Sequence, residues 1–256
     1  QFGFLNFSRL WQAMQNRLPT RADWFRVLSL FGLLTLLFPA PAFCGQDYVG
    51  QFDVYNGFAY FNSPDINLSQ RGYHLQLGYN AKTWLALGFD YSVVVGTLPL
   101  TANLLKPSLQ SAIQAQLMPL VLAGVIPPTY QLSVPTNSTT QTFAAGPQYE
   151  YRHFSRVTLF ARPSIGAIYE VATPHATDAI ATAVVRGLAP SGQKTQWTGF
   201  YGVGGGLEVN VTKHFALRMQ ADYVHNTLFT DLLKSARNTT RLSIGPAFHL
   251  GKNVAQ

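Results

Sequence analysis

The sequence predicts an all-β fold, an eight-stranded antiparallel up-and-down transmembrane β-barrel with a long helical loop between strands 3 and 4. Three observations predict it. Apolar and polar residues alternate along eight segments, each segment is long enough to span a membrane, and short and long connections alternate between them. Composition agrees, because charged residues make up only 11% of the 256 residues, against about 25% in soluble domains. The net charge of +7 forms no clustered basic face, which argues against nucleic acid as a partner.

The chain divides into an N-terminal extension with a signal peptide, over 1–44, and a barrel domain over 45–256. Basic residues precede an apolar run at 27–38, and the sequence Ala-Pro-Ala follows it. This run is too short for a membrane-spanning helix, which needs about 20 residues. The pattern therefore predicts export, with cleavage near Ala42 or Cys44.

The eight segments that follow residue 45 alternate with a period of two, which predicts strands. Each has the roughly 9–11 residues that a membrane-spanning strand requires, whereas strands of soluble proteins average about 5–6. The predicted strands are 46–61, 72–80, 83–96, 140–152, 157–171, 196–211, 215–229 and 239–251.

Short turns join strands 2 to 3, 4 to 5 and 6 to 7, while longer loops join the other consecutive pairs. Segregation of short turns and long loops is typical of outer-membrane barrels, with the turns periplasmic and the loops extracellular. The longest loop, 97–139, contains leucines at near-helical spacing and almost no charge. We expect a helix around 103–123, kinked or ended by Pro119. Its role could be a lid over the barrel mouth, an interfacial helix against the outer leaflet, or a docking segment for an extracellular partner.

Alternation alone does not say which face meets lipid. Three features favour the apolar face: Tyr and Trp near its strand ends, glycines on the opposite face, and balanced charges on that opposite face. In the seventh strand, Leu217 and Met219 then meet lipid and Arg218 points inward. Pairing of the inward charges predicts a plugged lumen. The predicted lumen polar network consists of Asp53, Asp90, Glu150, Arg152, Arg162, Glu170, Glu208, Arg218, Asp222 and Arg241.

Prolines interrupt three of these strands. Pro147, Pro163 and Pro246 lack the N–H that a closed ladder uses, and a barrel has no free edge on which to place them. We therefore expect β-bulges at all three positions.

Three stretches carry a family resemblance: TFAAGPQYEYR with VTLFARPSIG, then GVGGGLEVNVTKHFALRMQADYV, and finally NTTRLSIGPAFHLG. Over about residues 46–252 the chain resembles the outer membrane protein A-like β-barrel family. The resemblance implies eight antiparallel strands, periplasmic termini, and insertion by the barrel assembly machinery. It also implies that the protein is located in the outer membrane of a Gram-negative cell, where outer-membrane lipid and lipopolysaccharide would be its partners.

Several motifs have two interpretations. The stretch GVGGGLE at 202–208 has glycines like a phosphate loop, but its spacing and context favour lumen-facing glycines. His225 and Thr227 resemble the His-x-Ser pair of outer-membrane lipid A deacylases, yet no acid is predicted to orient the histidine. His74 and His249 could bind a metal, but hydrogen-bonded lumen histidines are favoured. We expect no cofactor and no metal.

Cys44 is the only cysteine, which leaves no intramolecular disulfide framework. Lipidation at Cys44 is a minor alternative, because a bulky Phe43 precedes it.

The leading functional hypothesis is a non-enzymatic outer-membrane barrel that contributes to envelope structure or to surface interaction through its extracellular loops. The alternatives are a narrow, porin-like pore, an outer-membrane lipid-modifying enzyme and, least favoured, a soluble lipocalin-type barrel.

Overall fold

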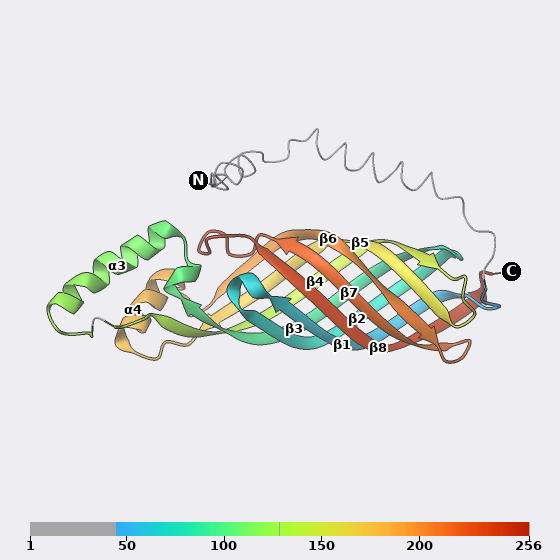
Figure 1. The fold of residues 1–256 in the computed structure, drawn as a ribbon, viewed down its shortest axis with the longest axis horizontal. Helices are drawn as coiled ribbons and strands as arrows, with labels where there is room; N and C mark the ends of the chain where they lie inside the picture. Colours follow the sequence, from blue (N-terminus) through green and yellow to red (C-terminus); the bar gives the residue numbers. More distant parts are fainter. Residues whose placement is uncertain (1–44, 128, 256) are drawn as a thin grey trace, which may run out of the picture. The chain divides into compact units, whose positions relative to one another are not determined.

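The computed structural model describes residues 45–127 and 129–255, so the expected signal peptide lies outside the described residues. Eight antiparallel strands close into a barrel in chain order, with the last strand paired to the first (Figure 1). This confirms the predicted fold class. The strands are β1 (Gly50–Ser63), β2 (Leu68–Lys82), β3 (Leu85–Thr101), β4 (Ser133–Tyr151), β5 (Val157–Pro174), β6 (Lys194–Asn210), β7 (Phe215–Asn226) and β8 (Arg237–Asn253).

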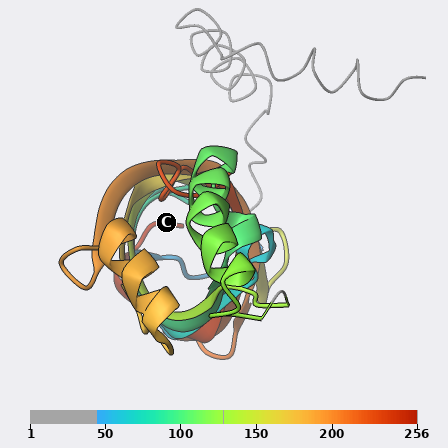
Figure 2. The same cartoon turned by 90° about the vertical axis from the view of Figure 1, so that its left-hand side faces the viewer.

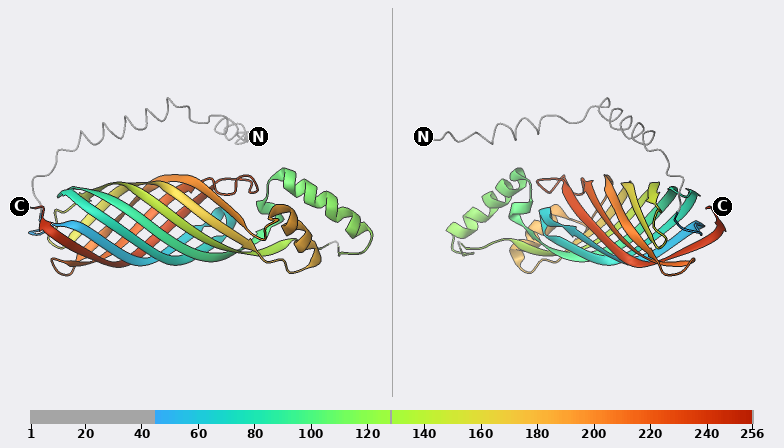
Figure 3. Two further views of the ribbon diagram at one scale, coloured as in Figure 1. Left: turned by 180° about the vertical axis from the view of Figure 1, so that it is seen from behind. Right: turned by 45° about the vertical axis from the view of Figure 1, so that its right-hand side comes forward.

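Short turns gather at one end of the barrel, which we call the turn end. They connect β2 to β3, β4 to β5 and β6 to β7. The other end, the helix end, carries the remaining connections (Figure 3). The prediction of a longer loop between β1 and β2 is wrong, because these strands are joined only by the 3-10 helix η1 (Pro64–Ile66) and Asn67. Asn67 adopts a left-handed conformation with φ 54°, which lets the chain reverse within a few residues.

The strands at the helix end extend beyond their predicted limits. β3 and β4 remain paired as far as Thr101 and Ser133, so the predicted loop 97–139 shrinks to residues 102–132. The reason is visible in the outward side chains. Thr97 and Asn137 are polar and exposed, so the apolar alternation that marks a lipid-facing strand is lost while the ladder continues.

The prediction of bulges at Pro147, Pro163 and Pro246 is wrong. The β4–β5 and β8–β1 ladders are interrupted at these prolines but resume in the same register beyond them. The missing N–H therefore opens the ladder locally, and pairs on both sides hold the strands in place. The register shifts within the described strands lie at the turn end, between Gly50 and Phe52 and between Asn80 and Lys82.

The connection between β3 and β4 contains the 3-10 helix η2 (Ala102–Leu104) and the helix α3 (Pro107–Leu122), within the predicted range. Proline at the first helical position suits the helix start. Pro119 does not end the helix, which continues to Leu122. Gly124 follows in the left-handed conformation with φ 69°. In the described ranges, no helix is long and apolar enough to cross a membrane.

A second helix, α4 (Ala179–Leu188), lies between β5 and β6 and was not predicted. The Asp178 carboxylate accepts a hydrogen bond from the Ala181 N–H at 2.7 Å and so caps its N-terminus. Both helices lie at the helix end, beside the barrel mouth (Figure 2). We call residues 102–127, 129–132 and 175–193 the helical cap. The apolar core that joins it to the strands is formed by Leu105, Ile113, Leu132, Val134 and Ala181.

Candidate functional site: a closed polar lumen under a helical cap

The barrel interior is polar and buried. Every residue of the predicted lumen network lies among the buried residues, and Arg218 is only 2% exposed. The outer wall shows the opposite character, since outward side chains such as Leu87 and Phe58 are both 53% exposed. Parity along each strand therefore separates charged groups inside from apolar groups outside.

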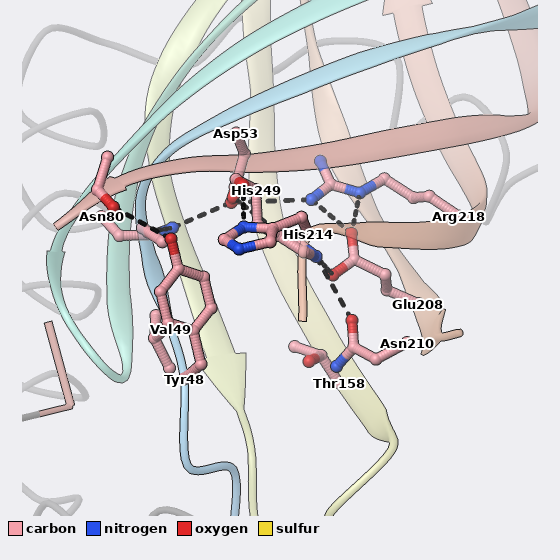
Figure 4. A network of polar contacts seen from close by, with 12 residues as sticks. Tyr48, Val49, Asp53, Asn80, Thr158, Glu208, Asn210, His214, Arg218 and His249 are labelled. Carbon is pink, nitrogen blue, oxygen red and sulfur yellow. Dashed lines mark hydrogen bonds and ion pairs between the residues drawn. The ribbon is translucent and has the colours of Figure 1, made fainter. Parts of the chain in front are cut away.

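Arg218 on β7 organises the cluster nearest the turn end (Figure 4). Its Nε donates to Glu208 Oε2 at 2.7 Å, and its Nη1 donates to Gln76 Oε1 at 2.8 Å. Its Nη2 lies 3.7 Å from Asp53 Oδ2. One guanidinium thus joins groups from β1, β2 and β6 across the lumen, which suits its planar fork of donors.

His249 on β8 links the two carboxylates of this cluster. Its Nδ1 lies 2.7 Å from Asp53 Oδ1, and its Nε2 lies 3.1 Å from Glu208 Oε1 and 3.2 Å from Asn210 Oδ1, to which it is hydrogen-bonded (Figure 4). Donation from both nitrogens requires the doubly protonated ring, which would add a second cation to the cluster. His249 is therefore engaged by carboxylates. The residues that the structure describes contain no group of three or more His, Cys, Asp or Glu that could hold a metal ion.

Amide side chains extend the turn-end cluster to β4. Gln76 donates to Gln148 Oε1 at 3.0 Å, and Gln148 donates to Glu150 Oε1 at 2.7 Å. Glu150 in turn pairs with Arg152. Glutamine carries both a donor and an acceptor, so it can connect ion pairs without adding charge.

A second cluster lies further along the lumen. Arg162 on β5 pairs with Asp90 on β3 and, at 3.3 Å, with Asp222 on β7. His74 Nε2 lies 3.1 Å from Asp90 Oδ1. Arg241 Nη2 lies 3.8 Å from Asp222 Oδ2, a looser contact. Since β3, β5 and β7 are not neighbours in the barrel, these pairs bridge the lumen itself.

Aromatic rings complete the filling around two of the arginines. The Arg218 guanidinium carbon lies 5.8 Å from the Tyr55 ring centroid and 5.3 Å from that of Phe160. The Arg241 guanidinium carbon lies 5.1 Å from the Phe61 ring centroid and 5.2 Å from that of Phe200. Such cation–π contacts stabilise a desolvated guanidinium while the rings occupy lumen volume.

The glycines at 202–206 make this filling possible. A Cβ on Gly204 would come within 1.7 Å of the Asp222 carboxylate, and a Cβ on Gly206 would come within 2.1 Å of the Met219 carbonyl oxygen and 2.7 Å of the Phe160 ring. Both positions therefore require the absence of a side chain. Their role in the structure is close approach inside the lumen.

Sequence reasoning missed Arg237, which forms the lumen ion pair nearest the helix end. Its Nη2 lies 2.6 Å from Glu170 Oε2, and Ser138 donates to Glu170 Oε1 at 2.8 Å. The predicted strand begins at residue 239 and therefore excludes Arg237. It shares the inward parity of Arg241, and a longer strand would have included it.

Around this pair, an apolar layer occupies the helix end of the lumen. We use that name for the buried cluster of Ile66, Leu68, Leu98, Ala144, Ile168, Phe200, Val224, Leu228, Phe229 and Leu233. Two ionic clusters, one further ion pair and an apolar layer thus lie along the lumen.

His225 and Thr227 do not assemble as a base and nucleophile. His225 Nδ1 lies 3.0 Å from Asn238 Oδ1, and the Thr227 hydroxyl lies 2.8 Å from that of Thr198. The partner of the histidine is therefore an amide, whereas hydroxyl activation needs the base on the hydroxyl and an orienting group behind the base.

In the helical cap, the Tyr130 hydroxyl donates to both carboxylate oxygens of Asp178 at 3.1 Å. Burial raises the pKa of the Tyr130 phenol, and the adjacent Asp178 carboxylate raises it further. The same carboxylate thus caps α4 and holds the segment that follows α3.

No family model matches the chain, and no curated protein matches it. Solved structures do match. Ail, the attachment invasion locus protein of Yersinia pestis, in complex with the heparin analogue sucrose octasulfate, is 14% identical with a TM-score of 0.44, over 78% of this chain and 99% of that one. Neisserial surface protein A is 13% identical with a TM-score of 0.48, over 79% of this chain and 99% of that one. The outer membrane protein OprG from Pseudomonas aeruginosa is 10% identical with a TM-score of 0.45, over 82% of this chain and 100% of that one.

Proposed function

We propose that this chain is a bacterial outer-membrane barrel with a closed lumen and no enzymatic role, which contributes to envelope structure or to surface interaction through its helical cap. The observation that carries the proposal is the inverted polarity of the barrel: its charges are buried inside and its apolar side chains are exposed outside. An exposed apolar band of this extent would be unstable in water, but it suits a hydrocarbon environment.

Aromatic side chains support a membrane position for this band. Toward the helix end, Phe143 lies between Tyr91 and Trp197, with ring centroids 5.1 and 5.8 Å away, and Tyr169 lies 4.8 Å from Trp197. At the turn end, other aromatic residues form a second group, which includes Trp84, Tyr149, Tyr151 and Phe154. Two aromatic girdles flanking an apolar band are typical of outer-membrane barrels.

Outward polar side chains lie beyond the aromatic group at the helix end. Thr97 donates to Asn137 across the β3–β4 ladder at 3.0 Å, and Ser69 donates to Asn62 across β1–β2 at 3.2 Å. Such a row suits water or lipid head groups. It supports a position for the helical cap outside the hydrocarbon, where it could contact lipopolysaccharide or an extracellular partner. Outer-membrane barrels place short turns in the periplasm, so the cap would face the cell exterior.

The packed lumen supports a plug over the narrow-pore alternative. Eight strands enclose an interior about wide enough for side chains to fill. The arginine bridges across the lumen and the apolar layer occupy this interior at successive levels. Ions would have to displace paired charges to pass.

Membrane fractionation with surface proteolysis tests the location. We expect the protein in the outer-membrane fraction, with protease added to intact cells cutting within 102–132 and leaving the barrel assembled. Recovery in the soluble fraction would refute the membrane barrel, and cleavage only after the periplasm is opened would reverse the topology.

Planar-bilayer conductance tests the closed lumen. We expect no steady openings from the wild type. Steady large-conductance openings would refute the plug and favour the pore.

A further inference from the structure

A cavity of about 70 Å³ lies at the helix end of the barrel. It is bounded by strand residues, by α4 and by the loop between β7 and β8, and most of its lining is aliphatic. The residues that matter here are Leu98, Val134, Val185, Leu188, Phe229 and Leu233. Empty apolar cavities stay dry and take apolar guests, because water finds too few polar partners inside them.

Polar groups bound this cavity in only a few places. The buried pair of Glu170 and Arg237 contributes to the lining, and the Arg237 Nε has no hydrogen-bond partner among the described residues. Its guanidinium carbon lies 5.9 Å from the Phe229 ring centroid. An apolar guest would therefore meet a charged barrier where the polar lumen begins, so the cavity is suited to retain a guest, not to pass it on.

Phe229 is held at the cavity wall by an unusual backbone. Its φ is 54°, in the left-handed region that a bulky side chain rarely adopts, yet its side chain is buried. The Phe229 N–H donates to Gln196, and its carbonyl accepts from the Leu233 N–H at 2.7 Å. Local strain of this kind persists when the surroundings hold it, and it concentrates at ligand-binding positions.

Lys194 is a cationic residue among those that line the cavity. Its Nζ pairs with Asp231, and the Lys194 and Asp231 side chains are 27% and 53% exposed. Exposed ion pairs contribute little to stability, so this pair can rearrange around another anion at small cost. The cavity therefore combines an apolar interior with an available cation.

We propose that this cavity binds the end of a linear alkyl chain whose anionic head group is contacted by Lys194. Its volume is about half that of a cavity of about 150 Å³ that accommodates benzene, so the end of a chain fits better than a ring. The chain could belong to a free fatty acid or to a membrane lipid. This inference goes beyond the proposed function and does not depend on which side of the membrane the helical cap lies on.

Photolabelling of the full chain in lipid nanodiscs tests the proposal. The first probe is decanoate with a terminal diazirine, followed by mass spectrometry of the labelled peptides. We expect label on α4 and on residues 227–236, saturable by unlabelled decanoate. A second arm places the same diazirine at the acyl end of a phospholipid in the nanodisc. Label in the cavity from that arm alone assigns the chain to membrane lipid, and label from free decanoate alone assigns it to a soluble ligand.

Two variants sharpen the test. Val185→Trp fills the cavity and should lower saturable labelling at least tenfold, while Leu122→Trp, at an 82% exposed position of α3, should leave it unchanged. Lys194→Gln should weaken competition by decanoate and spare competition by decanol. Free-decanoate label that unlabelled decanoate fails to displace, together with phospholipid label confined to the outer wall, would overturn the proposal. The competition uses the wild type, so it decides even if Val185→Trp fails to fold.

Discussion

The lumen and the helical cap bury opposite kinds of side chain within one chain. In the lumen, Arg218 and Glu208 are buried in a network of charges while the outward face is apolar. In the cap, Leu105 and Ile113 form an apolar core, and α3 exposes polar residues such as Gln114 together with apolar ones such as Leu122. The difference teaches that the medium around each region decides what is buried. Lipid accepts the apolar face of a barrel, whereas water accepts the polar face of a helix.

The two interiors should also respond differently to loss of a side chain. A truncated lumen arginine leaves a buried carboxylate without its guanidinium partner, inside a sheet in which every strand is paired on both sides. Truncation of a buried leucine in the helical cap leaves a cavity there, and the cap can unfold locally while the barrel stays closed.

Arg218→Ala should have the largest effect. It leaves Glu208 and Asp53 without their shared guanidinium, at a cost of about 3–5 kcal/mol for a broken buried pair. Urea unfolding in lipid vesicles, followed by heat-modifiable gel migration, measures it. Lys234→Ala at an exposed loop position is the control and should leave unfolding unchanged. Equal stability of the two variants would show that the network is not required.

Leu105→Ala should destabilise the helical cap by about 2–5 kcal/mol through the cavity that it leaves. Limited proteolysis should show faster cleavage within α3, while the gel shift of the barrel persists. The matched control is Leu122→Ala, since Leu122 is exposed. Loss of the gel shift would mean that cap and barrel unfold as one unit.

Asp178→Ala should remove the N-cap of α4 and the acceptor for Tyr130, at a cost of about 0.5–2 kcal/mol. Hydrogen exchange of the first-turn amides of α4 should accelerate, and Asp178→Asn should preserve most of the protection. Unchanged exchange in Asp178→Ala would show that the cap residue is dispensable.

Arg241→Met should have the smallest effect. Arg241 has only a loose contact with Asp222, which keeps Arg162, and an apolar chain of similar volume fits between its two phenyl neighbours. The Arg241 Nε and Nη1 have no hydrogen-bond partner among the described residues, so removing this weakly paired cation also removes a desolvation cost. Urea unfolding should give a midpoint close to that of the wild type. A loss as large as that of Arg218→Ala would show that the loose contact is essential.

Part of the candidate site could be predicted because strand parity is a local property. Arg218 and Leu217 must point to opposite faces in any strand, so alternation placed the charged residues on one face, and the glycines, aromatic residues and balanced charges predicted that this face points inward. Arg237 was missed because polar outward neighbours hid the start of β8. The helix α4 was missed because its ten residues, Ala179–Leu188, lie in a loop that no strand pattern constrains. Its Asp178 cap was nonetheless present in the sequence as a start signal.

The sequence by itself determined the number of strands, their two faces and the position of α3, because these depend on neighbours within a few residues. Only the tertiary structure decided which charges meet. Asp90 pairs with Arg162, and Glu170 pairs with Arg237, across the closed barrel and far apart in the chain. Closure also decided that the β4 and β5 prolines open the ladder without a bulge, and that Phe229, α4 and the strand ends enclose one cavity. These features depend on how distant strands are brought together, and the alternation of residues along a single strand contains no information about that arrangement.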